Sequence, residues 1–312
     1  MDIRKIPPLI DSHIHFVVDG MLTNEAGLLH IEDELLKHGI FSVNDMGHKS
    51  GIGLEAKKIL KGHLDIKSAG YAVYKKGTYG AFLGKGVAGK EEIKRVIKDI
   101  ADLGADFIKL INSGVVSIEG TGFVTGGGFS KEELKVIAEE AKKMDLEIRC
   151  HANGDKAIRN ALNIGVSSIE HGYFVSNETL HMMKEMDVSW TPTIYALLSF
   201  SSTLPFVERR YIEEVIENHL LSINYAALIG VKLNVGTDSG SKGVKHGESF
   251  FEELRLFQKA GLSLEQILSA ACMSKDAIAE GNFLIVEKDF IGTGKIETVF
   301  SGGRQIFFRQ LF

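Results

Sequence analysis

The sequence predicts an α/β protein, a (β/α)8 TIM barrel followed by a small, truncated β appendage at the C-terminal end. The chain has 312 residues, 44% of them hydrophobic and 25% charged. This composition is typical of globular proteins, and the length suits one barrel of about 250 residues with modest additions. Short apolar segments alternate with longer amphipathic ones up to residue 273, and short glycine-punctuated segments follow residue 281. This order of segments favours parallel βα units with a separate β tail.

Eight apolar segments have the length and composition of buried strands. They are Leu9–His13, Ile40–Asn44, Ile66–Val73, Phe107–Ile111, Glu147–His151, Ser168–His171, Ser189–Ile194 and Lys232–Asp238. The predicted helices between them include Glu91–Leu103, Ser130–Met144, Asp155–Ile164, Asn177–Met186 and Glu208–Ile229. Ser130 followed by Glu133 has the pattern of a capping box, which fixes one helix start. An open doubly wound sheet has the same alternation, so the pattern favours the barrel without excluding that sheet.

The C-terminal part of the chain changes from helical patterns to short apolar segments separated by glycines. Two helices, Ser249–Ala260 and Ser263–Met273, are expected after the eighth strand. The segments Phe283–Val286, Thr298–Phe300 and Gln305–Phe308 are then predicted to be short strands, because glycines separate them. We therefore predict two units: residues 1–281 form the barrel, and residues 282–312 form a short β appendage.

Charge, cysteine content and hydropathy exclude several classes of function. The net charge is −5 and basic residues are interleaved with acidic ones, so nucleic acid is not an expected partner. The two cysteines, Cys150 and Cys272, cannot build a disulfide framework and indicate a reducing compartment. No secretory signal and no apolar run of membrane-spanning length is present. A cytoplasmic protein that acts on a small molecule, without contact with a membrane, is expected.

Residues that can bind metal lie at the ends of five predicted strands. Side chains alternate along a strand, so His13 and His15 share one face. The others are Lys109, His151, His171 and Asp238. The carboxyl ends of barrel strands meet in one bowl, where imidazoles and a carboxylate would bind Zn2+ or a similar cation. One His-x-His pair is weak evidence, because a histidine that closes a strand is more often structural. Six candidates on five strands are a much stronger signal.

Several sequence motifs resemble those of a known protein family. These are DSHIHF, ADFIKL, IRCHANGDKAI, SIEHGYF, TPTIYA and VGTDSG…KHGESFFEEL. Together they resemble the amidohydrolase superfamily, and within it the branch that is imidazolonepropionase-like and prolidase-like (related to Xaa-Pro dipeptidases). The resemblance runs in the correct order from about Leu9 to Gly281. It implies a (β/α)8 barrel with two divalent metal ions, Zn2+ above all, at its mouth.

The resemblance also implies a role for each candidate ligand. His13 and His15 would hold a buried metal ion that Asp238 also contacts, and His151 and His171 would hold the outer one. Lys109 would bridge the two after carboxylation by CO2. A carbamate forms only from a neutral amine, so Lys109 must lie where burial lowers its pKa. The apolar neighbours of Lys109 in the sequence fit that requirement.

The expected reaction is hydrolysis of an amide-type C–N bond by a hydroxide that the two metal ions share. The substrate would be a dipeptide, an N-acyl amino acid or a cyclic amide. Asp238 is the candidate general base, and it would return its proton to the leaving amine. Tyr195 and His246 are candidate substrate contacts. The loops Tyr74–Gly86 and Gly120–Gly128 would form the walls of the site.

The sequence departs from the family at its N-terminal end. Most relatives build a β-sandwich domain from both chain ends, whereas here the His-x-His pair comes at His13, so the N-terminal half of that sandwich is expected to be absent. A tail with few covering partners would leave an apolar edge, which predicts a homo-oligomer. Two alternatives to the binuclear hydrolase are a mononuclear aminohydrolase (deaminase) and a non-catalytic relative. The lysine at position 109 argues against the first, and the complete ligand set against the second.

Overall fold

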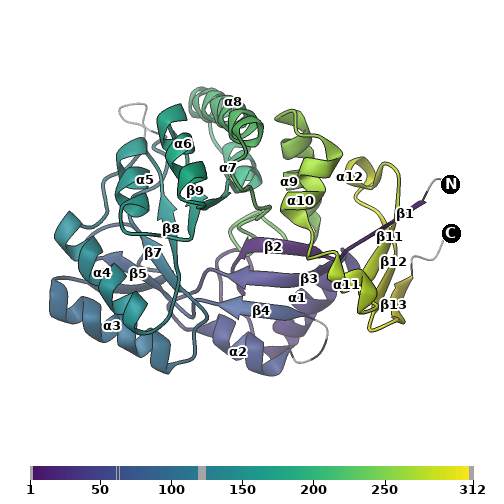
Figure 1. Cartoon of the computed structure of the whole chain (residues 1–312), viewed down its shortest axis with the longest axis horizontal. Helices are drawn as coiled ribbons and strands as arrows, with labels where there is room; N and C mark the ends of the chain where they lie inside the picture. Colours follow the sequence, from purple (N-terminus) through teal and green to yellow (C-terminus); the bar gives the residue numbers. More distant parts are fainter. Residues whose placement is uncertain (1–2, 61, 63, 119–123, 309–312) are drawn as a thin grey trace.

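A computed structural model describes residues 3–60, 62, 64–118 and 124–308 (Figure 1). Its largest sheet is parallel and has the strand order β10-β9-β8-β7-β5-β6. In chain order these strands are β5 (Ala72–Lys75), β6 (Gly84–Val87), β7 (Ile108–Ile111), β8 (Ile148–Ala152), β9 (Ser168–His171) and β10 (Ser189–Thr191). A second parallel sheet has the order β2-β3-β4 and consists of β2 (Leu9–Ile14), β3 (Ile40–Asp45) and β4 (Asp65–Ser68).

Backbone hydrogen bonds connect these two sheets through the segment 232–239. On one side, Trp190 of β10 donates to Lys232 at 2.8 Å and accepts from Asn234 at 2.8 Å. On the other side, Ser12 of β2 donates to Val235 at 2.8 Å. The segment that the sequence predicts as the eighth strand therefore lies between β10 and β2, although it forms only isolated bridges instead of a regular strand.

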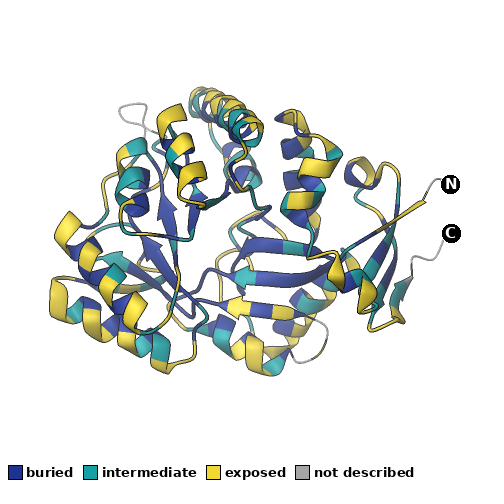
Figure 2. Cartoon of the chain, in the orientation of Figure 1, coloured by how far each residue is buried: buried dark blue, intermediate teal, exposed yellow. Residues whose placement is uncertain are grey.

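Helices pack on the outside of the strands. In chain order they are α1 (Glu25–Lys37), α2 (Ile52–Ile59), α3 (Lys90–Asp102), α4 (Lys131–Lys143), α5 (Asp155–Leu162), α6 (Asn177–Glu185), α7 (Ile194–Ser201), α8 (Phe206–Ile229), α9 (Glu248–Lys259), α10 (Leu264–Ala271), α11 (Asp276–Ala279) and α12 (Phe290–Thr293). In α3 the buried side chains recur at helical spacing, at Ile93, Val96, Ile97 and Ile100. Figure 2 shows β7, β8 and β9 buried, with the exposed faces of α3 and α4 turned outward.

The predicted capping box is confirmed. The Ser130 hydroxyl accepts from the Glu133 backbone N–H at 3.2 Å, and the Glu133 carboxylate accepts from the Ser130 N–H at 3.0 Å. A second capping box, formed by Ser263 and Gln266, starts α10. Within the described ranges, no helix combines the length and apolarity that a membrane crossing requires.

A small antiparallel sheet with the order β1-β11-β12-β13 lies at one end of the molecule, close to both chain termini (Figure 1). It consists of β1 (Ile3–Ile6), β11 (Phe283–Glu287), β12 (Ile296–Ser301) and β13 (Arg304–Phe308). The expectation that the N-terminal end adds nothing to this sheet is wrong, because β1 pairs with β11 along its whole length. The division of the chain at residue 282 stays a prediction.

The apolar face of the small sheet is covered within the chain. Leu284, Val286 and Val299 have no exposed surface. Leu284 lies so close to Gly39, just after α1, that a Cβ at this glycine would come within 2.6 Å of its Cδ1 atom. This burial means that one face of the small sheet needs no second chain to cover it, although Ile3 on the same sheet is 55% exposed. A homo-oligomer stays a prediction.

Two further predicted segments also differ from the observed ones. The predicted strand Ile66–Val73 is split into β4 and β5, because Gly70 has φ 66° and turns the chain between them. The predicted loop Tyr74–Gly86 contains most of β6, which pairs with β5. Much of the predicted loop Gly120–Gly128 lies outside the described residues.

Candidate active site

The six predicted metal ligands lie close to one another at the carboxyl ends of the strands. His13 is in β2 and His15 follows it, Lys109 is in β7, His151 is in β8 and His171 ends β9. Asp238 lies near the end of the segment 232–239, where its backbone N–H donates to the His13 carbonyl at 2.7 Å. Sequence positions far apart are thus brought together because neighbouring parallel strands end on the same side.

The four imidazole rings form a chain of contacts. The ring centroids of His13 and His15 are 5.6 Å apart, those of His13 and His171 are 5.0 Å apart, and those of His151 and His171 are 4.6 Å apart. All of these side chains are mostly or fully buried. Burial, reinforced by the nearby charge of Lys109, lowers the pKa of His13 and of His151 to about 4. Both rings are therefore neutral at physiological pH, which is the form that binds metal ions.

Hydrogen bonds orient the rings of His13 and His15 so that one nitrogen of each faces Asp238. His13 Nδ1 lies 2.6 Å from Glu170 Oε2, so it donates to this carboxylate. His15 Nδ1 donates to the Gly47 carbonyl at 2.8 Å. Nε2 of both rings then faces Asp238, whose Oδ1 lies 3.7 Å from His13 Nε2 and 3.1 Å from His15 Nε2. The neutral His13 leaves its Nε2 unprotonated. The His15 Nε2–H donates to Asp238, and although burial lowers the pKa of His15, this hydrogen bond and the Asp238 charge raise it overall. A partner on the second nitrogen is the usual arrangement of a metal-binding histidine.

The other two histidines are oriented in the same manner. His151 Nε2 donates to the Gly114 carbonyl at 2.9 Å, which leaves Nδ1 available. His171 Nδ1 lies 2.6 Å from the Thr193 hydroxyl oxygen. That hydroxyl donates its only proton to the Pro192 carbonyl at 2.8 Å, so it accepts from His171 and leaves Nε2 of this ring available.

Backbone strain accompanies three of these positions. His171 has φ 67°, Asp238 φ 59° and Thr193 φ 49°, which is left-handed backbone at non-glycine residues. Such conformations cost free energy and persist where the surrounding structure imposes them, often at functional sites. Here they aim the side chains of strand-terminal residues at one another.

Asp238 is available as an acidic ligand and as a base. Its side chain is 19% exposed, whereas the His13 side chain is 1% exposed. Burial raises its pKa, but the hydrogen bond from His15 and the charges of His13, His15 and Lys109 outweigh burial and hold the pKa at about 2. Asp238 is therefore a carboxylate at neutral pH.

Lys109 is the buried amine that the carbamate interpretation requires. It is 1% exposed, and its Nζ atom has no hydrogen-bond partner within the described part of the chain. Burial lowers the pKa of Lys109, against the opposing charges of Glu170 and Asp238. A charged amine without a partner costs free energy at such a buried position. Reaction with CO2 would convert the amine of Lys109 into a carbamate anion, and two bound metal cations would balance its charge.

These residues fit divalent cations. One ligand atom each from His13, His171 and Asp238 can be chosen such that all three lie within 4.8 Å of one another. Nε2 of His15, which would release its proton on binding a metal ion, and Nδ1 of His151 are the remaining imidazole donor atoms of the set. A donor set of neutral imidazoles, a carboxylate and a potential carbamate suits Zn2+ or a similar ion.

A cavity of about 490 Å³ opens over these residues. Asp238, His151 and His171 line its base, and its walls come from the loop after β7, from α7 and from the loop after the segment 232–239. The walls are largely apolar, as is typical of pockets that bind small molecules.

The comparison with known proteins agrees with this geometry. A model of the amidohydrolase family matches residues 5–274. The chain belongs to this family. A similar curated protein is the ochratoxinase of Aspergillus niger, which is 27% identical over 289 residues, a match that covers 76% of this chain and 58% of that protein. The chain thus spans less than two thirds of the length of this relative.

Two solved structures of similar fold illustrate the likeness. A Xaa-Pro dipeptidase with bound methionine in its active site has a TM-score of 0.78 and 23% identity, and the match covers 96% of this chain and 86% of that one. The A. niger ochratoxinase has a TM-score of 0.80 and 22% identity, with 99% and 84% covered. These similarities establish an amidohydrolase-like α/β fold.

Neither predicted substrate contact is among the described residues that line the cavity of about 490 Å³. Tyr195 is the second residue of α7, and its backbone N–H donates to Glu253 at 2.7 Å. His246 is buried, and its Nε2 donates to the His15 carbonyl at 3.0 Å. His246 lines a neighbouring cavity together with residues of α1. Contact between either side chain and a substrate stays a prediction.

Three buried carboxyl groups that no sequence motif indicated also support the site. Glu170 binds His13. Asp11 accepts from the Thr237 hydroxyl at 2.7 Å and from its N–H at 3.0 Å, which joins β2 to the segment that carries Asp238. Glu253 accepts from the first two backbone N–H groups of α7, just after Thr193. Burial raises the pKa of Asp11 to about 7 and that of Glu253 to about 8.

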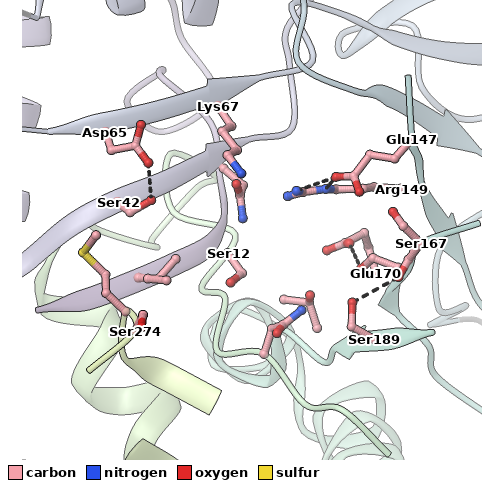
Figure 3. Close-up of a pocket in the computed structure, with 16 residues that line it drawn as sticks. Ser12, Ser42, Asp65, Lys67, Glu147, Arg149, Ser167, Glu170, Ser189 and Ser274 are labelled. Atoms are coloured by element: carbon pink, nitrogen blue, oxygen red, sulfur yellow. Dashed lines mark hydrogen bonds and ion pairs between the residues drawn. The ribbon is translucent and has the colours of Figure 1, made fainter. Parts of the chain in front are cut away.

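A second cavity, of about 380 Å³, lies at the opposite ends of the strands (Figure 3). Its lining is mainly polar and includes Lys67, Glu147, Arg149 and Glu170. Glu147 is engaged by Arg149 at 2.7 Å. Glu170 reaches from this cavity to His13, so the layer beneath the metal ligands is polar and hydrogen-bonded.

Proposed function

We propose that this chain is a metal-dependent hydrolase of the prolidase-like branch that cleaves a C–N amide-type bond in a dipeptide, an N-acyl amino acid or a cyclic amide. The observation that carries the proposal is the set of four buried or partly buried imidazoles, each with one nitrogen held by a supporting group, that converge with Asp238 and the unpaired amine of Lys109. We further propose that the strands close into a (β/α)8 barrel through the segment 232–239.

The ligand assignment follows from the free atoms. His13 Nε2, His15 Nε2 and Asp238 would hold the inner ion, and His151 Nδ1 and His171 Nε2 the outer one. Lys109, carboxylated by CO2, would supply an oxygen to each. Two such ions, Zn2+ above all, would polarise the scissile carbonyl and provide a shared hydroxide near neutral pH.

The protein itself supplies orientation and a site for the proton. Glu170, the Gly47 and Gly114 carbonyls and Thr193 hold the imidazoles in one tautomer. Asp238, which is ionised, accepts the proton of the attacking water on a carboxylate oxygen. As the C–N bond breaks, this proton passes to the leaving nitrogen, so the products are a carboxylic acid and an amine. A positioned base of this kind contributes roughly 10²–10⁴-fold to the rate.

The deciding experiment counts metal ions. We would purify the protein in the presence of bicarbonate and Zn2+, measure bound metal by elemental mass spectrometry, and record the carbamate carbon by 13C NMR after labelling with 13C-bicarbonate. The variants are Lys109→Ala and, as a control, Lys67→Ala, which changes an exposed strand lysine. We expect about two ions per chain and a carbamate signal in the parent and in the control.

The outcomes separate the candidate functions. Loss of metal and of the carbamate signal in Lys109→Ala, together with hydrolysis of dipeptides or N-acyl amino acids by the parent, would support the proposal. One ion per chain in both parent and Lys109→Ala would replace it with a mononuclear aminohydrolase. No bound metal in any variant would favour a non-catalytic relative. A cytoplasmic location and a homo-oligomer stay predictions that these measurements do not address.

A further inference from the structure

Several apolar side chains with exposed surface line the cavity over the predicted metal ligands. Val115, Ile118 and Phe200 are partly exposed large hydrophobic residues, with exposed fractions of 36%, 36% and 44%. All three line this one cavity. Val116, Leu197 and Val244 extend the same walls. Exposed apolar side chains gathered around a pocket mark a binding surface, because they gain free energy when a ligand covers them.

One cationic side chain interrupts this apolar lining. Lys242 is the single lysine or arginine among the lining residues that the structure describes, and Asp238 is the single carboxylate. Lys242 is exposed, and none of the ion pairs found between described residues includes it. By contrast Lys245, three residues further along the same loop, pairs with Glu248 at 3.0 Å.

The loop that carries Lys242 is held in place from three sides. Ser241 donates from its hydroxyl to Asp238 Oδ1 at 3.2 Å and from its backbone N–H to the Asp238 carbonyl at 3.3 Å. Ser199 of α7 donates to the Gly243 carbonyl at 3.0 Å. The Gly243 N–H donates to Asp19 at 2.9 Å. Lys242 therefore projects from a fixed turn that begins at the proposed catalytic carboxylate.

We propose that the substrate is an N-acyl amino acid with a bulky apolar acyl group, and that Lys242 binds its free carboxylate. This inference rests on the proposed function. The carboxylate belongs to the leaving amino acid, because Asp238 hands its proton to the leaving nitrogen and Lys242 lies on the same turn. The acyl chain then occupies the walls that Val115, Ile118 and Phe200 form. Cyclic amides without a carboxylate and substrates with cationic side chains are excluded by this assignment.

The test compares two substrates that differ only in charge, octanoyl-L-alanine and octanoyl-L-alaninamide, on the metal-loaded protein. In Lys242→Glu we expect the ratio of kcat/KM for the acid to that for the amide to fall at least about tenfold, mostly through KM, since a hydrogen bond to a charged group is worth this much or more. Lys242→Arg should keep most of the preference. Lys245→Glu is the matched control, with the same charge change on the same loop.

The apolar half of the proposal has its own readout. In Phe200→Ala we expect the preference for octanoyl-L-alanine over acetyl-L-alanine to fall about tenfold, because part of the acyl chain loses its cover. The acid-to-amide ratio should stay unchanged in this variant. A ratio unaffected by Lys242→Glu, or altered equally by Lys245→Glu, would overturn the role of Lys242.

A binding measurement separates failure of this inference from failure of the proposed function. The ketone 2-methyl-4-oxoundecanoic acid has CH2 in place of the scissile NH and cannot be hydrolysed as an amide. Calorimetric titration should detect its binding to the parent and about tenfold weaker binding to Lys242→Glu. Binding with this dependence but without hydrolysis of any amide would refute the function alone. Hydrolysis without discrimination by Lys242 would refute the inference alone, and neither binding nor hydrolysis would refute both.

Discussion

Replacement of Glu170 by glutamine tests whether the carboxylate that holds His13 contributes to the affinity of the site for metal ions. Glu170 has no exposed surface, and its Oε2 accepts the proton of His13 Nδ1 at 2.6 Å. Its other oxygen accepts from the Ser168 hydroxyl. Burial raises the pKa of Glu170, but the hydrogen bond and charge of His13 together with the charge of Lys109 lower it to about 2. The group is therefore a carboxylate that fixes the tautomer of His13.

The amide preserves the shape of the side chain but removes its charge. A charge-assisted hydrogen bond becomes a neutral one, and the amide can present its own N–H to His13. Loss of a partner that orients a metal-binding histidine typically weakens metal affinity about 10–100-fold. This corresponds to about 1.4–2.7 kcal/mol of binding free energy. A smaller additional loss of folding stability is expected, because a buried polar contact is weakened.

The assay is competition for Zn2+ with a chromophoric chelator, run on the parent, on Glu170→Gln and on Glu147→Gln. Glu147 also lines the second cavity, of about 380 Å³, but its partly exposed side chain pairs with Arg149 (Figure 3). Substitution of Glu147 therefore controls for a general loss of negative charge. A Zn2+ affinity of Glu170→Gln within about threefold of the control would refute the reasoning, since orientation of His13 would then contribute almost nothing.

Two further substitutions probe the turn at the start of α7. Thr193→Val keeps the shape but leaves the His171 N–H without its acceptor, so Zn2+ affinity should fall about 10–100-fold in the chelator assay, whereas Thr191→Val, also buried, should change it little. Burial raises the pKa of Glu253 to about 8. Between the ordinary pKa of a glutamate and pH 8, the folded protein therefore keeps a proton on Glu253 that the unfolded chain has released. The free energy of unfolding of the parent consequently falls as pH rises towards 8. The stability difference between the metal-free parent and Glu253→Gln should therefore shrink by about 1.4 kcal/mol per pH unit between pH 5.5 and 7.5 in urea unfolding. A constant difference would show that the two backbone N–H donors keep this carboxyl ionised.

The sequence determined most of the elements and the metal-binding side chains. Strand alternation and strand ends are local properties, so His13, His15, His151 and His171 could be placed at one edge of a parallel sheet before any coordinates were known. The capping box at Ser130 is equally local and was found within one residue of the observed helix start. Strand ends also indicated Lys109 and Asp238, the resemblance added their roles, and the structure buries Lys109 as the carbamate interpretation requires.

Only the tertiary structure decided how these side chains are supported. Glu170 meets His13 across 157 positions of sequence, and Asp11 meets Thr237 across 226. A carboxyl group inside a strand or an amphipathic helix gives no local sign of such a partner, which is why Glu253 in α9 also escaped prediction. The strand β1 was missed for the same reason, since four residues before two prolines become a strand only through pairing with β11. Local spacing fixes which face a side chain occupies, whereas its partner, its burial and hence its charge depend on the packing of distant segments.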